Sequence, residues 1–204
     1  MSDPVSNAER DVESSSDATV PASPPAPALP RRLGLFLAVA SVALGLDLMS
    51  KIVVVASDLG PGHPAVPILG GAIYLTETRN SGAAFSLGTG MTIVLTMLAF
   101  AVVGVILRMA GRMRSVGWAV ALGLVLGGAL GNLTDRIFRD PGVGRGTVVD
   151  WISLFADDGH IWPIFNLADS AIVSGAVLLA VLALCGIEID GRGTRVRRGG
   201  HRSE

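Results

Sequence analysis

The sequence predicts an α-helical membrane protein in which four helices cross the bilayer. Half of its 204 residues are hydrophobic and only 16% are charged, whereas a soluble domain usually carries about 25% charged residues. The apolar residues also form long blocks, and a helix needs roughly 20 residues, with about 17 as the lower limit, to cross the hydrocarbon core. Four blocks reach this length: Leu33–Ala56, Met91–Leu107, Val116–Leu133 and Ala171–Ile187.

The arginines indicate how these spans are oriented. With four spans, one side carries ten arginines at or near the ends of the spans: Arg31, Arg32, Arg108, Arg112, Arg114, Arg192, Arg195, Arg197, Arg198 and Arg202. The other side carries four: Arg79, Arg136, Arg139 and Arg145. Because positive residues are enriched on the cytoplasmic side, both termini are expected in the cytoplasm. The formal net charge of −1 hides this asymmetry and gives no indication of nucleic-acid binding.

A cleaved signal peptide is the alternative interpretation of the first block, since two arginines precede it. The block is longer than the usual apolar region of a signal peptide, and thirty-two residues come before it. It also contains Asp47 and Lys51, which are unusual in a signal peptide. A permanent first span is therefore favoured.

Composition divides the chain into three regions. Residues 1–32 are acidic and then rich in proline, alanine and serine, which predicts a disordered cytoplasmic tail. Residues 33–187 form the four-span region. Residues 188–204 are a basic cytoplasmic tail, which we expect to lie against anionic lipid headgroups.

The two segments outside the membrane are longer than the cytoplasmic connection and are where functional residues are expected. Ser57–Gly90 contains a short β-prone stretch, Ala72–Thr78. Thr134–Asp169 contains Val148–Phe155, whose periodicity suits a short amphipathic helix or a strand on the membrane surface.

Several polar or small residues in the spans have a structural interpretation. Asp47 and Lys51 are spaced i, i+4 with the acid first, which favours an ion pair that docks the first helix against polar loop residues. A stripe of Gly123, Gly127 and Gly131 favours close helix packing. Asn132, Asp135 and Arg136 follow the stripe, and the adjacent arginine is expected to keep Asp135 ionised in a fixed polar network. A direct catalytic role for Asp47 or proton transfer by Asp135 is the less favoured alternative.

Asp150 and Asp169 have a different setting, because each has apolar neighbours and no adjacent cation. If the fold brings them together, burial and mutual repulsion would raise one pKa and leave the pair sharing a proton. An aspartyl protease requires such a pair, in which one carboxylate activates water and the other, protonated, polarises the scissile carbonyl. The alternative is that Asp169 caps the fourth helix and Asp150 faces solvent.

Other catalytic sets have less support. His63, His160 and His201 do not show a metal-binding spacing. Ser170 lacks the context of a nucleophile elbow, and Cys185 is a single cysteine with a packing or lipid-facing interpretation.

Five motifs in this order resemble the lipoprotein signal peptidase family, the bacterial signal peptidases II. They are DLMSK at Asp47–Lys51, NSGAAFS at Asn80–Ser86, GNLTDR at Gly131–Arg136, VVD at Val148–Asp150 and FNLADS at Phe165–Ser170. The resemblance covers most of Leu33–Ile187. One departure is Ser50, where the family often has threonine; a hydroxyl remains, so little effect is expected.

The resemblance implies a four-span aspartyl endopeptidase of the bacterial cell membrane, with a small extracytoplasmic β-containing cradle and an active site near that face. It implies cleavage of prolipoproteins on the N-terminal side of a diacylglyceryl-modified cysteine, without metal, cofactor or an obligate protein partner. Membrane lipids would surround the four spans. The catalytic pair matches Asp150 and Asp169. The substrate-binding positions match Asn80, Gly82, Ala83, Asn132, Arg136 and Asn166, while Asp47, Lys51 and Asp135 remain structural polar residues.

Two other functions remain as alternatives. A proton-coupled transporter would place carboxylates near the middle of the membrane and show inverted repeats. A scaffold would use the glycine stripe for helix association but leave VVD and FNLADS without a role. The acids gather at one predicted interface and no repeat is visible, so both are less favoured.

Overall fold

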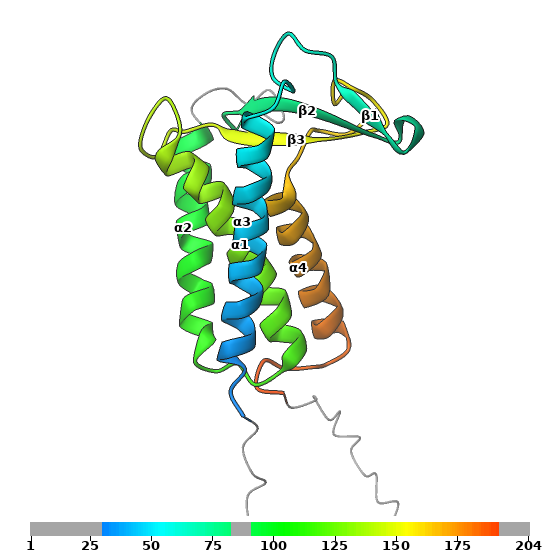
Figure 1. Cartoon of the computed structure of the whole chain (residues 1–204). Coiled ribbons are helices and arrows are strands. Elements are labelled where there is room, and N and C mark those ends of the chain that lie inside the picture. Colours follow the sequence, from blue (N-terminus) through cyan, green and yellow to red (C-terminus); the bar gives the residue numbers. More distant parts are fainter. Residues whose placement is uncertain (1–29, 83–90, 192–204) are drawn as a thin grey trace, which may run out of the picture.

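The computed structural model describes residues 30–82 and 91–191, which form four long helices and a small sheet at one end of the helix bundle (Figure 1). The helices are α1 (Leu33–Val55), α2 (Met91–Ala110), α3 (Val116–Phe138) and α4 (Leu167–Leu184). All four are long and apolar enough to cross a membrane. The predicted fold class is therefore confirmed.

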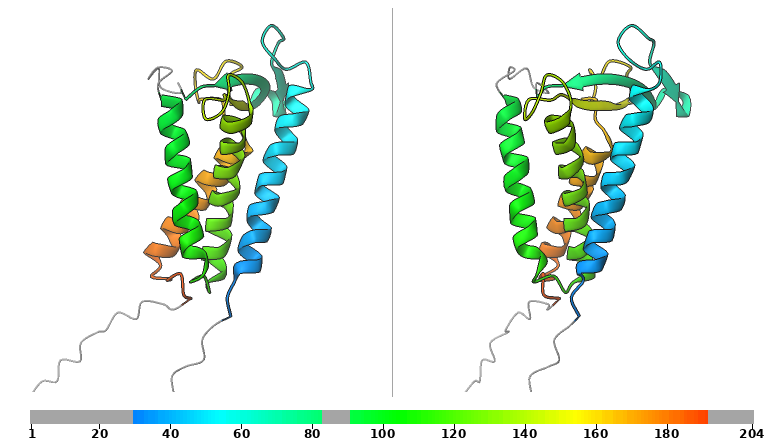
Figure 2. Two further views of the ribbon diagram at one scale, coloured as in Figure 1. Left: turned by 90° about the vertical axis from the view of Figure 1, so that its left-hand side faces the viewer. Right: turned by 60° about the vertical axis from the view of Figure 1, so that its left-hand side comes forward.

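Helix α3 is the centre of the bundle and packs against each of the other three helices (Figure 2). In its most apolar stretch 56% of the residues are buried inside the protein, compared with 17% for α1 and α4 and 11% for α2. The outer faces of these three helices carry exposed aliphatic side chains such as Val42, Met97 and Val177. Helices that are apolar on their exposed faces are typical of a protein surrounded by lipid.

Small residues on α3 let the neighbouring helices approach its backbone. A Cβ at Gly127, in the predicted stripe, would lie 2.6 Å from a backbone oxygen of α1. Gly128 faces the other neighbour, and a Cβ there would lie 2.4 Å from the carbonyl oxygen of Ala168 in α4. The packing role expected for the stripe is confirmed, and Gly128 adds a contact that the i, i+4 spacing does not include.

Two helices extend beyond their apolar blocks at the sheet end of the bundle. Helix α3 continues past Leu133 to Phe138, and α4 begins at Leu167 rather than at Ala171. The additional turns carry polar residues, among which Asp135 is buried and Asp169 is half-buried. These turns supply most of the site described below.

The sheet has three antiparallel strands in the order β1-β2-β3: β1 (Val66–Ile68), β2 (Ile73–Asn80) and β3 (Val148–Leu154). The predicted β-prone stretch corresponds to β2. Of the two possibilities left open for residues 148–155, the strand is the one observed. The register pairs Thr78 with Asp150 and Asn80 with Val148, so the end of β2 lies beside the start of β3. The sheet lies across the end of the bundle (Figure 1).

Candidate active site

Asp150 lies in β3 and is held by two asparagine amides. Its Oδ2 accepts a hydrogen bond from Asn80 Nδ2 at 2.8 Å, and its Oδ1 accepts one from Asn166 Nδ2 at 2.6 Å. The residue is only 1% exposed. The alternative in which Asp150 faces solvent is therefore wrong.

Asp169 lies in the first turn of α4, where it takes part in capping the helix. Its Oδ2 accepts a hydrogen bond from the backbone N–H of Asn166 at 3.3 Å, and the side chain of Asn166 accepts one from the backbone N–H of Asp169 at 3.0 Å. Its other oxygen, Oδ1, accepts a hydrogen bond from Asn132 Nδ2 at 2.8 Å. The capping interpretation is correct for Asp169, but the same carboxylate also belongs to the polar cluster that contains Asp150.

Asn166 connects the two aspartates and is fully buried. Its Nδ2 donates to Asp150, and its backbone N–H donates to Asp169. The same Nδ2 lies 3.1 Å from Asn132 Oδ1 and 3.3 Å from the carbonyl oxygen of Val149. The structure thus places the predicted pair on the two sides of one asparagine.

The pKa of the Asp150 carboxyl is raised to about 7. Burial is the main cause, because the ionised form loses its hydration, and the nearby charge of Asp169 acts in the same direction. Hydrogen bonds from Asn80 and Asn166 favour the carboxylate and act against this increase. Both protonation states of Asp150 are therefore populated near neutral pH, as acid–base catalysis requires.

Arg136 lies close enough to Asp150 and Asp169 to attract both carboxylates. Its Nη1 is buried and has no hydrogen-bond partner among the described residues. Arg136 and Asn132 also line a cavity of about 220 Å³ between α2, α3 and α4, whose other walls are apolar: Leu95, Leu98, Ala99, Val102, Val125, Ala129 and Ile172. A guanidinium donor therefore lies beside an apolar groove within the bundle.

A second cavity, of about 320 Å³, opens at the sheet beside Asp150. Its lining is more polar and includes the segment from Thr78 to Ser81, together with Asp158, Gly159, Pro163 and Ile164. The aspartate cluster therefore has a polar cleft at the sheet and an apolar groove among the helices.

Gly82 supports Asn80, which is one of the partners of Asp150. Its backbone N–H donates to Asn80 Oδ1 at 2.7 Å, which turns the amide nitrogen of Asn80 toward Asp150. Gly82 has a φ of +97°, a conformation that glycine adopts without strain. Ala83, the other residue predicted in this close-contact segment, lies outside the described residues.

The expected ion pair between Asp47 and Lys51 is present, with Lys51 Nζ 2.7 Å from Asp47 Oδ2 and both side chains fully buried. Its surroundings differ from the expectation, because it contacts α3 and α4 instead of polar loop residues. Lys51 also pairs with Asp135 Oδ2 at 2.8 Å, and Asp47 Oδ1 accepts a hydrogen bond from the backbone N–H of Ala168 at 3.0 Å.

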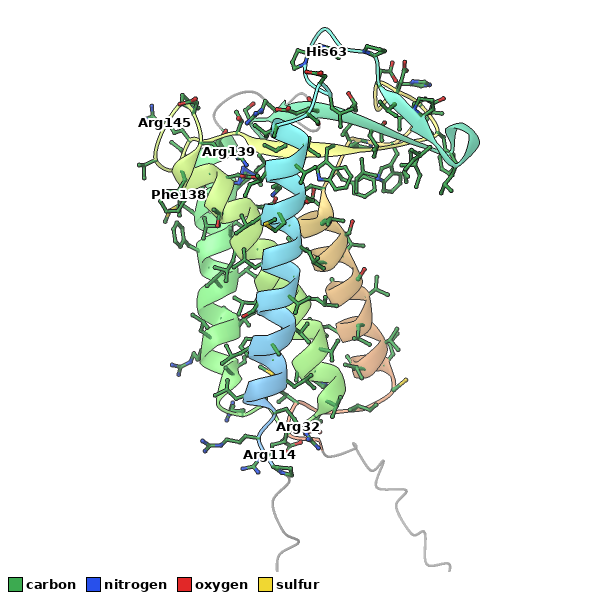
Figure 3. The ribbon with its side chains drawn as sticks, in the orientation of Figure 1. Arg32, His63, Arg114, Phe138, Arg139 and Arg145 are labelled. Carbon is green, nitrogen blue, oxygen red and sulfur yellow. The ribbon has the colours of Figure 1, made fainter. Side chains whose placement is uncertain are left out.

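The partner expected for Asp135 is wrong. Adjacent residues of a helix point about 100° apart, and the cations that contact Asp135 are Lys51 and Arg139 rather than Arg136. Arg139, which lies at the end of α3 (Figure 3), was not singled out from the sequence. Its i, i+4 spacing from Asp135 is the signal that could have identified it.

Known proteins of one family resemble this chain over most of its length. Residues 39–185 match the family model described as signal peptidase (SPase) II. The lipoprotein signal peptidase of Rhodococcus jostii (strain RHA1) is 48% identical over 190 residues, covering 93% of this chain and 92% of the relative. That of Mycobacterium tuberculosis (strain H37Rv) is 50% identical over 172 residues, covering 84% and 82%.

A solved structure described as a bacterial membrane enzyme, determined by the in meso method at 1.9 Å resolution, has the same fold. Its TM-score is 0.65 at 24% sequence identity, and the match covers 78% of this chain and 97% of the other. This similarity concerns the fold alone, whereas the family match and the relatives concern the sequence over most of the chain. The chain belongs to the signal peptidase II family of aspartic peptidases.

Proposed function

We propose that Asp150 and Asp169 are the catalytic pair with which this signal peptidase II hydrolyses prolipoproteins. The observation that carries the proposal is the arrangement of two carboxylates around Asn166, one of them buried with a pKa of about 7. The bond cut would lie on the N-terminal side of a cysteine that carries diacylglycerol.

The surroundings of the two aspartates favour different roles. Asp169 lies at the N-terminus of α4, where the helix dipole and the donors Asn132 and Asn166 stabilise a negative charge. We therefore assign it as the base. Asp150 retains a proton near neutral pH and is the acid.

The reaction then follows the usual course of an aspartyl protease. Asp169 takes a proton from water, and the hydroxide oxygen bonds to the scissile carbonyl carbon while Asp150 protonates the carbonyl oxygen. When the tetrahedral intermediate collapses, the C–N bond breaks and the leaving nitrogen takes the proton from Asp169. Asp150 recovers its proton from the diol hydroxyl, which leaves a new carboxyl group on the signal peptide.

The remaining predicted residues have places in substrate binding. Asn80, Asn132 and Asn166 orient the carboxylates, and Gly82 follows Ser81 in the wall of the polar cleft in which the peptide would lie. Ala83 stays a predicted contact. The free donor of Arg136, beside the apolar groove, suits a carbonyl oxygen of the lipidated substrate. The groove itself suits a lipid acyl chain, which would keep the scissile bond at the interface.

The arrangement of charges supports the expected topology. Both ends of the described chain lie at the end of the bundle opposite the sheet (Figure 1). Arg32 and Arg114 lie at that same end (Figure 3), as expected for a cytoplasmic face. We infer that residues 33–187 are the peptidase domain of a bacterial cell-membrane protein. Its two tails would be cytoplasmic and its active site near the extracytoplasmic face.

A gel-shift assay on a diacylated prolipoprotein tests the catalytic pair. Asp150→Asn and Asp169→Asn should each lower the cleavage rate by about 10²–10⁴-fold, the usual contribution of general acid–base catalysis. Asp157→Asn, which changes an exposed acid outside the aspartate cluster, is the matched control and should cleave normally. Normal processing by either catalytic-site variant would remove the basis for the proposal.

A further inference from the structure

Lys51 is a buried cation that the proposed hydrolysis does not use. An ammonium group has three N–H donors and no acceptor, and Lys51 Nζ has three oxygen neighbours. Nζ lies 2.7 Å from Asp47 Oδ2, 2.8 Å from Asp135 Oδ2 and 3.1 Å from Asn132 Oδ1. The side chain is fully buried among these groups, so Lys51 acts through its three partners.

Two of these partners hold the backbone directly before the two aspartates of the catalytic pair. Asp47 Oδ1 accepts the backbone N–H of Ala168 at 3.0 Å, and Ala168 precedes Asp169. Asp135 Oδ2 accepts the backbone N–H of Val149 at 3.3 Å, and Val149 precedes Asp150. Through Asp47 and Asp135, one ammonium group thus connects α4 and β3 at the residues that precede Asp169 and Asp150.

The third partner reaches a catalytic carboxylate itself. Since Lys51 can only donate, the side chain of Asn132 must turn its Oδ1 toward Nζ. This leaves Asn132 Nδ2 to donate to Asp169 Oδ1 at 2.8 Å. Without the cation, the hydrogen bond from Asn166 Nδ2 at 3.1 Å would be left to hold Asn132 Oδ1 away from the carboxylate.

We propose that Lys51 is a positioning residue that fixes the separation of Asp150 and Asp169 and the orientation of the Asn132 amide. This inference rests on the catalytic pair proposed above. A misplacement of about 1 Å in a catalytic group can cost roughly 10²-fold in rate. Loss of the contacts that Lys51 makes should therefore lower kcat.

The test must separate positioning from folding. Asp47, Lys51 and Asp135 are buried, and with the half-buried Arg139 they form a cluster of two acids and two cations. Removing Lys51 alone would leave a carboxylate without compensation, which is strongly unfavourable. The double variant Asp47→Asn/Lys51→Met keeps the charge of the cluster balanced, and the new asparagine can still accept the N–H of Ala168.

Steady-state cleavage of a diacylated prolipoprotein, corrected for the folded fraction, should give a kcat about 100-fold below wild type for the double variant, with KM within about 3-fold. Lys51→Arg should recover the folded yield, because the cation remains. Its planar guanidinium cannot direct three donors from one nitrogen, so its kcat should stay at least about 10-fold low. Gly123→Ala is the control, because its Cβ would crowd α1 at Phe36 and not at the catalytic pair. It should lower Tm and leave kcat unchanged.

A double variant with wild-type kcat would overturn the inference and leave Lys51 a purely structural residue. If the double variant gives no folded protein, the kcat of Lys51→Arg tests the inference. Wild-type kcat in Lys51→Arg would show that a positive charge is enough and would overturn the positioning role. Asp150→Asn and Asp169→Asn in the same assay separate the two proposals. If both are inactive while the double variant has normal kcat, only the positioning role fails; if either is active, the catalytic pair fails.

Discussion

Two pairs of carboxylates lie at the sheet end of the bundle, and their partners differ. Asp47 and Asp135 share the ammonium group of Lys51. Asp150 and Asp169 are instead hydrogen-bonded to asparagine groups, and no described cation forms an ion pair with either of them.

This difference in partners suits the two pairs of carboxylates to two purposes. A buried cation in contact with a carboxylate favours its charged form, so the pair at Lys51 is suited to hold structure. Amide donors hold the Asp150 carboxyl in place, and its burial raises the pKa to about 7. The polar residues of one site are therefore divided into an ion-paired frame around Lys51 and a catalytic pair bound to asparagines.

The largest expected effect distinguishes the ion-paired residues around Lys51 from the catalytic pair. Asp135→Asn removes one acid from between two cations and should lower the free energy of unfolding by about 3 kcal/mol. The asparagine can still accept the N–H of Val149, so the folded fraction should cleave within about 10-fold of wild type. Folded yield, Tm and cleavage rate together test this. A fully expressed, stable and inactive Asp135→Asn protein would contradict the structural assignment.

A smaller effect is expected at Gly128, where α3 packs against α4 directly before Asp169. Gly128→Ala would place a Cβ 2.4 Å from the carbonyl oxygen of Ala168, and such overpacking typically costs about 1–3 kcal/mol. Because Ala168 precedes Asp169, kcat should fall as well. Gly123→Ala should cost similar stability without the loss of kcat. Equal kcat values for the two variants would show that α4 absorbs the displacement.

The smallest expected effect is a shift in pH dependence. The hydrogen bond from Asn80 lowers the pKa of Asp150, so Asn80→Ala should raise it. Asp150 would then keep its catalytic proton to higher pH. The alkaline limb of the kcat/KM profile, expected near pH 7 for the wild type, should move upward. A downward movement would contradict the assignment of Asp150 as the acid.

Local spacing in the sequence predicted the spans and much of the polar and glycine contacts between them. The length of the apolar blocks predicts the number of spans, and i, i+4 spacing identifies both the Asp47–Lys51 pair and the glycine stripe. The same rule applied to Asp135 would have selected Arg139 instead of Arg136. Sequence adjacency was the wrong criterion there, because neighbouring residues of a helix face different directions.

The connections between the frame and the catalytic pair could not be predicted in this way. Lys51 and Asn132 are 81 residues apart, and their contact depends on how closely α1 and α3 pack. The central position of Asn166 likewise depends on where α4 begins, and its first turn is too polar to read from hydropathy. The motif resemblance pointed to the two aspartates, but only the fold shows Asn166 between them.

The protonation of Asp150 can be measured directly by infrared difference spectroscopy during a pH titration of the folded protein in membranes. A protonated carboxyl band should be present at about pH 6, disappear with a midpoint near pH 7, and be absent in Asp150→Asn. Persistence of that titrating band in Asp150→Asn, or its absence from the wild type between about pH 6 and 8, would contradict a catalytic pair in which Asp150 holds the proton.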